Sequence, residues 1–222
     1  MGQMIELTAA DGFRLTAWRA DPAGTPRGGL VVVQEIFGVN GHIRSVCDGY
    51  AADGYRAIAP ALFDRYERSV DIGYTPEEIA RGRELKALAT ADAALRDVAA
   101  ARDALAGTGR IGVVGYCWGG YIAWLAAARL TGFAGAVPYY GGGMLDAGDE
   151  QPRCPVLAHF GERDTMIPVA GVQQFAAAHP EVQVFVYPAD HGFNCDQRGS
   201  YDAAAARLAR ERSLAFLREH VG

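Results

Sequence analysis

Short apolar runs alternate with longer stretches of helical composition along almost the whole chain. At residues 30–33 four aliphatic side chains follow one another without a polar residue between them. Such a run is typical of a strand buried on both faces, because a half-buried strand would alternate apolar and polar residues. The same reading predicts further buried strands at 55–59, 110–114, 135–139, 156–160 and 182–187, and an antiparallel edge strand at 13–20.

The segments between these strands have the composition of helices. Thr75 is placed to cap a long helical stretch, with Pro76 at its first position. Strands that alternate with helices favour an α/β fold with a mostly parallel central sheet and helices on both faces. No linker or repeat interrupts the pattern, so we expect a single domain over residues 1–222. The predicted helices span residues 42–52, 76–106, 120–130, 169–178 and 201–220.

Charge and composition narrow the class of function. The chain has 21 basic and 26 acidic residues, a formal net charge of −5 and no basic run. It therefore lacks the footprint of a protein that binds nucleic acid or an anionic membrane. No apolar stretch reaches the ~18 residues of a membrane span, and the first residues show no secretory pattern. We expect a cytoplasmic monomer whose partner is a small molecule.

Residues 115–120 carry the sequence Gly-Tyr-Cys-Trp-Gly-Gly, between a predicted strand and a predicted helix. This is the form of a G-x-S-x-G nucleophile elbow, with Cys117 in the place of serine. Gly115 and Gly119 are needed there, because a sharp strand-to-helix turn leaves no room for side chains. The N-terminus of the following helix favours the thiolate, which is the reactive form of cysteine. An inert buried cysteine in a glycine-rich turn is the alternative.

Two polar residues follow later strands. Asp164 comes after the strand at 156–160, and His191 comes after the strand at 182–187. Taken alone, Asp164 could be a turn residue. The chain order nucleophile, acid, histidine is nevertheless that of α/β-hydrolases, so these two residues and Cys117 are the predicted catalytic triad.

The other histidines and cysteines need no catalytic role. We expect His159 to pack within a strand, and His42, His179 and His220 to lie at the surface. No cysteine pair has CxxC spacing, so reduced thiols are expected. Histidines and cysteines do not fall at metal-ligand spacings either, and neither a metal nor an organic cofactor is predicted.

Taken together, these motifs resemble the dienelactone hydrolases (carboxymethylenebutenolidases) over nearly the whole chain. Beyond the elbow, the likeness rests on Gln-Glu-Ile-Phe-Gly at 34–38 and Pro-Tyr-Tyr-Gly at 138–141. The resemblance implies that Glu35 contacts the nucleophile and accepts its proton when substrate binds. It also implies that the backbone N–H groups of Ile36 and Trp118 form the oxyanion hole, where the general rule for this fold also places them. A capping carboxylate is the alternative role for Glu35.

The resemblance further implies hydrolysis of dienelactone to maleylacetate, a step of aromatic degradation, through a thioester acyl-enzyme. In the family, two arginines hold the carboxylate of dienelactone. Arg81 and Arg83 both fall in the segment that supplies the first. The second should follow His191 by four residues, where this chain has Cys195, and Arg198 is the nearest substitute. Candidate pocket walls, with aromatic core packing as the alternative, are Phe37, Tyr139 and Tyr140.

Three functions therefore remain open at this point. The first is a hydrolase for a small carboxylated lactone such as dienelactone. The second has the same chemistry but acts on a neutral ester, thioester or other lactone, as Cys195 would allow. The third is a fold without catalysis that binds a ligand or a protein; it is disfavoured because every catalytic position holds a competent residue.

Overall fold

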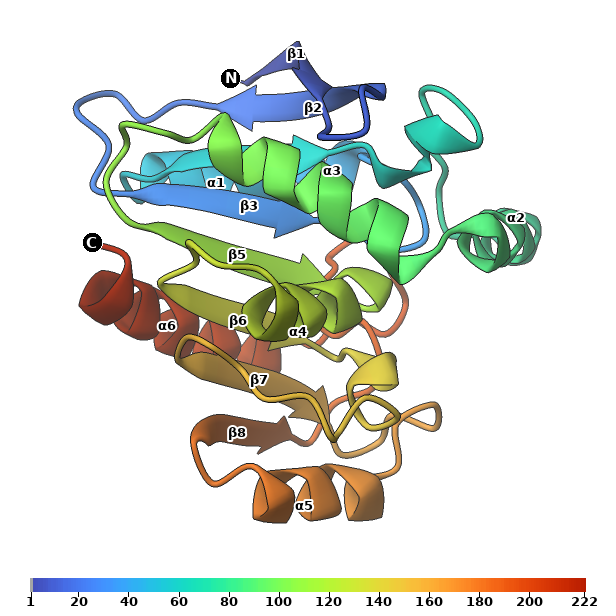
Figure 1. Ribbon diagram of the computed structural model, residues 1–222. Helices are drawn as coiled ribbons and strands as arrows, with labels where there is room; N and C mark the ends of the chain where they lie inside the picture. Colours follow the sequence, from blue (N-terminus) through green and yellow to red (C-terminus); the bar gives the residue numbers. More distant parts are fainter. Residues whose placement is uncertain (1) are drawn as a thin grey trace.

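One mixed sheet forms the centre of the protein, which a computed structural model describes over residues 2–222 (Figure 1). Its strands are β1 (Gln3–Thr8), β2 (Arg14–Ala20), β3 (Gly29–Val33), β4 (Arg56–Pro60), β5 (Ile111–Tyr116), β6 (Gly135–Tyr139), β7 (Val156–Gly161) and β8 (Val182–Tyr187). They lie in the order β1-β2-β4-β3-β5-β6-β7-β8. Strands β3 to β8 run parallel, and β1 and β2 are antiparallel additions at one end.

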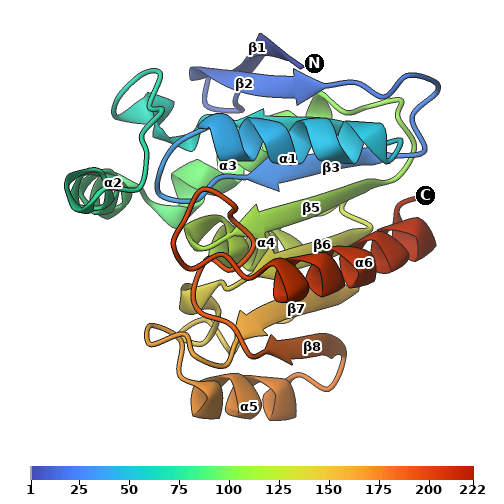
Figure 2. The same cartoon turned by 180° about the vertical axis from the view of Figure 1, so that it is seen from behind.

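Helices cover both faces of this sheet. They are α1 (Gly41–Ala52), α2 (Pro76–Leu88), α3 (Ala91–Asp103), α4 (Trp118–Arg129), α5 (Val169–Ala178) and α6 (Ala203–His220). Helices α3 and α4 cover the face seen in Figure 1, and α1 and α6 cover the face seen in Figure 2. Helix α2 stands beyond the carboxyl ends of the parallel strands. The predicted α/β architecture is thus confirmed. None of the helices within residues 2–222 is both long and apolar enough to cross a membrane.

The core explains why β3 and α4 are almost entirely apolar. Every residue of β3 is buried, as a strand covered by helices on both faces requires. Helix α4 packs against β5, β6, α3 and the short 3₁₀ helix η2 (Gly142–Met144), so it too is apolar nearly all round. Trp124, which is fully buried, contacts Phe175 of α5 with ring centroids 5.2 Å apart. This packing fixes the position of the N-terminus of α4.

Two predicted elements differ from the structure. The strand predicted at 13–20 is not an edge strand, because β1 pairs along its outer side from Gln3↔Arg19 to Thr8↔Arg14. Strand β1 is mostly exposed and so has little apolar pattern to reveal it. The helix predicted at 76–106 is two helices, since the backbone is extended at Ala89 and the Thr90 side chain caps α3. The predicted Thr75 cap of α2 is confirmed.

The histidine predictions are partly wrong. His159 is buried within β7, as expected, and both of its ring nitrogens are hydrogen-bonded. His42 and His179 were expected at the surface, but both are buried, at 3% and 1% exposure. His220 is half-buried. Both rings can be buried because each lies near a carboxylate, which the sequence pattern does not reveal. His179 Nδ1 lies 2.9 Å from Glu181 Oε1, and His42 Nδ1 lies 3.7 Å from Asp196 Oδ1.

Candidate active site

Cys117 lies at the turn from β5 into α4, at the carboxyl edge of the sheet. Its backbone has φ 55° and ψ −117°, a conformation that costs a residue other than glycine roughly 1–3 kcal/mol. The turn is held by a 3.0 Å hydrogen bond from the Cys117 N–H to the Tyr139 carbonyl. A side chain on Gly115 would collide with the carbonyl of Gly119, and one on Gly119 would collide with that of Gln34. Both glycines of the motif are therefore sterically required.

The loops after β7 and β8 bring Asp164 and His191 together. His191 Nδ1 lies 2.7 Å from Asp164 Oδ2, and both side chains are buried. Asp164 Oδ1 accepts hydrogen bonds from the backbone N–H groups of Met166 at 2.9 Å and Ile167 at 3.2 Å. The carboxylate is thus held in one orientation and in turn orients the imidazole. His191 Nε2 is buried and has no hydrogen-bond partner among residues 2–222.

The surroundings of His191 favour its protonated form. Burial acts to lower the pKa of His191, but the Asp164 carboxylate and the neighbouring Cys117 side chain raise it, to about 10. An opposite charge within hydrogen-bond distance has this effect because it stabilises the imidazolium. At neutral pH the ring therefore holds a proton that it can give to a leaving group.

Cys117 and His191 open into the same cavity, which has a volume of about 460 Å³. A cavity of this size accommodates a small organic ligand. The other residues that line it are Lys86, Trp118, Tyr121, Gly142, Gly143, Asp146, Met166 and Ile167. Most of these come from α4 and from the loops after β6 and β7, and among them only Trp118 was predicted from the sequence.

The segment after β3 supplies the other half of the site. Gln34 is fully buried and fixes this segment: its Oε1 accepts from the Leu62 N–H at 3.1 Å, and its Nε2 donates to the Glu35 carbonyl at 3.3 Å. The N–H groups of Ile36 and Trp118 donate to no other residue within 2–222. Trp118 is the first residue of α4, where backbone donors lack a partner within the helix. Both predicted oxyanion donors are therefore free.

The structure pairs Glu35 with Arg198. Glu35 is 1% exposed, and its Oε1 accepts a 3.2 Å hydrogen bond from Arg198 Nη1. The guanidinium also lies against the rings of Phe37 and Tyr74, at 5.7 and 5.9 Å from their centroids. The second oxygen, Oε2, is buried and has no partner among the described residues. The expected contact from Glu35 to Cys117 is not among the hydrogen bonds of residues 2–222.

Neither arginine predicted from α2 lines the cavity. Arg81 is exposed and pairs with two glutamates of its own neighbourhood, and Arg83 is exposed as well. The residue of α2 that does line the cavity is Lys86. The sequence feature that could have pointed to Lys86 is Gly82, one helical turn earlier. Because Gly82 has no side chain, α2 can lie against the carbonyl of Ile36.

The three predicted aromatic wall residues belong to the packed interior. The Tyr139 hydroxyl bonds to Ser213 at 2.7 Å, and Phe37 is 2% exposed. Of the three rings, that of Tyr140 packs against the predicted triad, with its centroid 5.1 Å from that of His191. None of the three lines the cavity around Cys117. These three residues therefore fit the alternative prediction, aromatic packing in the core.

A thiol at a strand-to-helix elbow, with a histidine and an acid supplied by later strands of a parallel sheet, defines the class of the protein as an α/β-hydrolase. Comparison with known proteins then identifies the family, since the model of the Dienelactone hydrolase family matches residues 15–221. The chain belongs to this family and is a hydrolase that acts on ester bonds, as the sequence resemblance predicted.

Individual relatives agree with this placement. The chain is 41% identical over 198 residues to a "Putative carboxymethylenebutenolidase" of Synechocystis sp., with 80% of each chain covered. It is 36% identical to a protein of the same name from Azospirillum brasilense, with 98% of this chain and 99% of that protein covered. The crystal structure of a "Putative Dienelactone Hydrolase" from Klebsiella pneumoniae matches with a TM-score of 0.86 and 31% identity, covering 98% of this chain and 100% of the other.

Proposed function

We propose that the protein hydrolyses a small carboxylated lactone, dienelactone (carboxymethylenebutenolide), to maleylacetate through a Cys117–His191–Asp164 triad. One observation carries the proposal. The thiol of Cys117 and the free Nε2 of His191 share one small cavity, while Nδ1 of the same ring is held by Asp164 at 2.7 Å. That arrangement supplies a nucleophile, a proton donor and a group that orients it.

The acylation step uses two proton carriers. Glu35 takes the proton of the Cys117 thiol, and the thiolate sulfur attacks the lactone carbonyl carbon. The N–H groups of Ile36 and Trp118 stabilise the oxyanion that forms. The carbonyl carbon then loses its bond to the ring oxygen, which takes the proton of His191. The product of this step is a thioester on Cys117 that carries the opened chain.

Hydrolysis of the thioester returns every group to its first state. Neutral His191 accepts a proton from water as the hydroxide adds to the thioester carbonyl carbon. The carbon–sulfur bond breaks, releasing the carboxylic acid, and the thiolate takes back its proton from Glu35. Because Cys117 is acylated before this step, its contribution to the raised pKa of His191 is absent, and the ring is a better base than in the resting enzyme.

The charged side chains that line the cavity affect whether it binds an anionic or a neutral substrate. Lys86 places an ammonium on the wall, where it can pair with the carboxylate of a lactone. A second candidate substrate is a neutral ester, thioester or lactone. It is favoured by Asp146, which lies on the same wall, and by Arg198, whose guanidinium is already engaged by Glu35.

The test compares wild type with Cys117→Ala on dienelactone and on the neutral ester p-nitrophenyl acetate. We expect dienelactone to have much the higher kcat/KM, and the variant to lose at least about 10³-fold on both substrates. Cys154→Ala, at the other half-buried cysteine, is the control and should retain activity. Turnover of the neutral ester alone would select the second substrate class. Equal activity of wild type and Cys117→Ala would refute the mechanism.

A further inference from the structure

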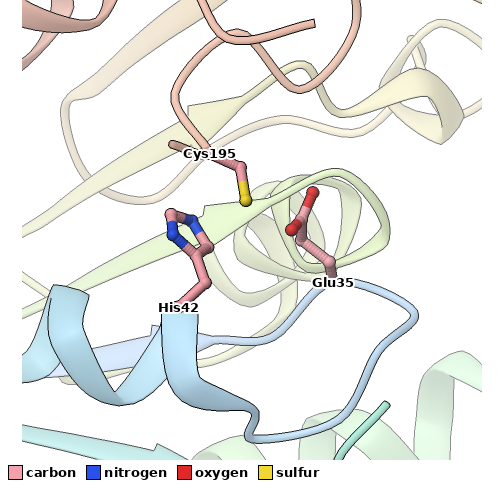
Figure 3. Close-up of side chains that lie close together, drawn as sticks. All are labelled: Glu35, His42 and Cys195. Carbon is pink, nitrogen blue, oxygen red and sulfur yellow. The ribbon is translucent and has the colours of Figure 1, made fainter. Parts of the chain in front are cut away.

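Glu35 and two other side chains of types that bind metal ions meet from separate parts of the chain (Figure 3). Glu35 follows β3, His42 lies in the first turn of α1, and Cys195 lies in the loop after β8. A carboxylate oxygen, a ring nitrogen and the sulfur lie within 4.8 Å of one another. All three residues are buried, at 1%, 3% and 0% exposure.

Two atoms of this cluster lack a partner. Glu35 Oε2 and His42 Nε2 are buried without a hydrogen bond to any residue within 2–222. Buried polar atoms left in that state are rare, because each loses its hydration without replacement. The Asp196 carboxylate lies 3.7 Å from His42 Nδ1, and its charge favours the tautomer that carries the ring proton on Nδ1 and a lone pair on Nε2. These two unpartnered lone pairs call for a ligand that accepts electron pairs.

We propose that Glu35, His42 and Cys195 form a binding site for a divalent transition-metal ion of the zinc type. Carboxylate, imidazole and thiolate are the three donors that Zn²⁺ takes in proteins, and three of them leave a fourth position open for water. Donor atoms on a tetrahedral zinc lie roughly 3.3–3.8 Å apart, given bond lengths of about 2.0–2.3 Å. Each pair of donor atoms therefore needs to close by no more than roughly 1–1.5 Å around the ion.

The residues around the cluster suit a bound cation. The Cys195 thiol donates a 3.2 Å hydrogen bond to the Tyr74 hydroxyl, which also accepts one from Asn40. Once a metal ion replaces the thiol proton, the same hydroxyl can donate its proton to the thiolate. The charges also balance. Ionised Glu35, Cys195 and Asp196 together with the Arg198 guanidinium sum to −2, which a divalent ion neutralises.

One of the three side chains also borders a cavity that Cys117 does not line. A second cavity, of about 300 Å³, lies between α1 and α6. Its wall includes His42 and Asp196 but neither Glu35 nor Cys195, so it meets the cluster at the imidazole. The sequence did not indicate this site, because residues 35, 42 and 195 share no metal-binding motif.

A bound ion has a consequence for catalysis, and this clause rests on the proposed function. Coordination by Oε2 withholds the Glu35 carboxylate from the Cys117 thiol. Zinc is therefore an inhibitor that acts on the acid–base partner of the nucleophile, and it leaves the substrate cavity open. Inhibition should appear mainly in kcat.

Binding is tested first, with Co²⁺ as a spectroscopic probe in a Cys117→Ala background that prevents metal capture by the triad. We expect one equivalent of Co²⁺ to give a thiolate-to-metal charge-transfer band, which Zn²⁺ abolishes by displacing Co²⁺. Cys195→Ser should remove the band, and Cys154→Ser, the matched control, should keep it. Asp196→Asn, at an exposed side chain that does not threaten folding, should weaken binding roughly 10- to 100-fold.

The outcomes separate this proposal from the proposed function. Absence of the band, or its survival in Cys195→Ser, overturns the metal site and leaves the hydrolase mechanism as it stands. Binding of Zn²⁺ together with a fall in kcat of the protein with Cys117 intact supports both. Binding without inhibition supports the site but contradicts the role of Glu35 as proton acceptor.

Discussion

Two buried carboxylates are predicted to act in the candidate active site, and they are held in different ways. Asp164 accepts three hydrogen bonds, one from His191 on Oδ2 and two from backbone N–H groups on Oδ1. Glu35 accepts one, from Arg198, and its second oxygen has no partner within residues 2–222. A carboxylate with both oxygens engaged keeps a single orientation. One with a free oxygen can take a proton or an ion, and this difference underlies the two roles that we propose.

The largest expected effect is on the fixed carboxylate. Asp164→Asn should lower kcat roughly 10³- to 10⁴-fold, because an amide no longer holds the His191 ring in the tautomer and charge state that the reaction needs. Steady-state kinetics on dienelactone or p-nitrophenyl acetate measure the loss. Glu162→Gln, an exposed acid on the same loop, is the matched control and should have little effect. A reversed result would move the catalytic acid to Glu162.

A smaller effect is expected at the carboxylate with the free oxygen. Glu35→Gln should slow acylation roughly 10²-fold, since the amide accepts no proton from the thiol. The amide oxygen still accepts the Arg198 hydrogen bond, so the melting temperature should change little. Pre-steady-state release of p-nitrophenol isolates the acylation step. Glu67→Gln, at the exposed partner of Arg81, serves as control. Unchanged acylation would contradict the distinction between the two carboxylates.

The rim of the cavity should show a smaller effect still, and only for an anionic substrate. Lys86→Gln should raise the KM for dienelactone about 3- to 10-fold, the scale expected for one partly solvated charge pair. It should leave the KM for p-nitrophenyl acetate unchanged. Arg83→Gln, on the same helix but outside the cavity, is the control. Equal effects of the two variants on dienelactone would mean that long-range charge, rather than contact, attracts the substrate.

The pH dependence of stability tests the Asp164–His191 pair without reference to turnover. The pKa of His191 rises from 6.5 to about 10 on folding, so the stabilisation is complete below pH 6.5 and is lost as pH rises through about 10. The free energy of unfolding of wild type, measured by urea unfolding between pH 6 and 10, should fall toward that of Asp164→Asn. A constant difference across this range would show that the pair does not hold an extra proton.

Much of this molecule follows from local pattern. The aliphatic run at residues 30–33 predicted strand β3, and Thr75 followed by Pro76 predicted the start of α2. The structure contains both elements. The need for Gly115 and Gly119 was predicted from the geometry of a sharp turn. In the folded chain, a side chain at either position would collide with backbone atoms. These features are local because strand burial, helix capping and a tight turn each depend on a few neighbouring residues.

Other features were decided only when distant segments packed together. Strand β1 has little apolar pattern, and its place outside β2 is set by pairing. Lys86 faces the cavity because Gly82 lets α2 lie on the β3 loop. The meeting of Glu35 with His42 and Cys195 depends on the order of strands in the sheet. No local periodicity encodes such contacts, since their energy arises from groups far apart along the chain.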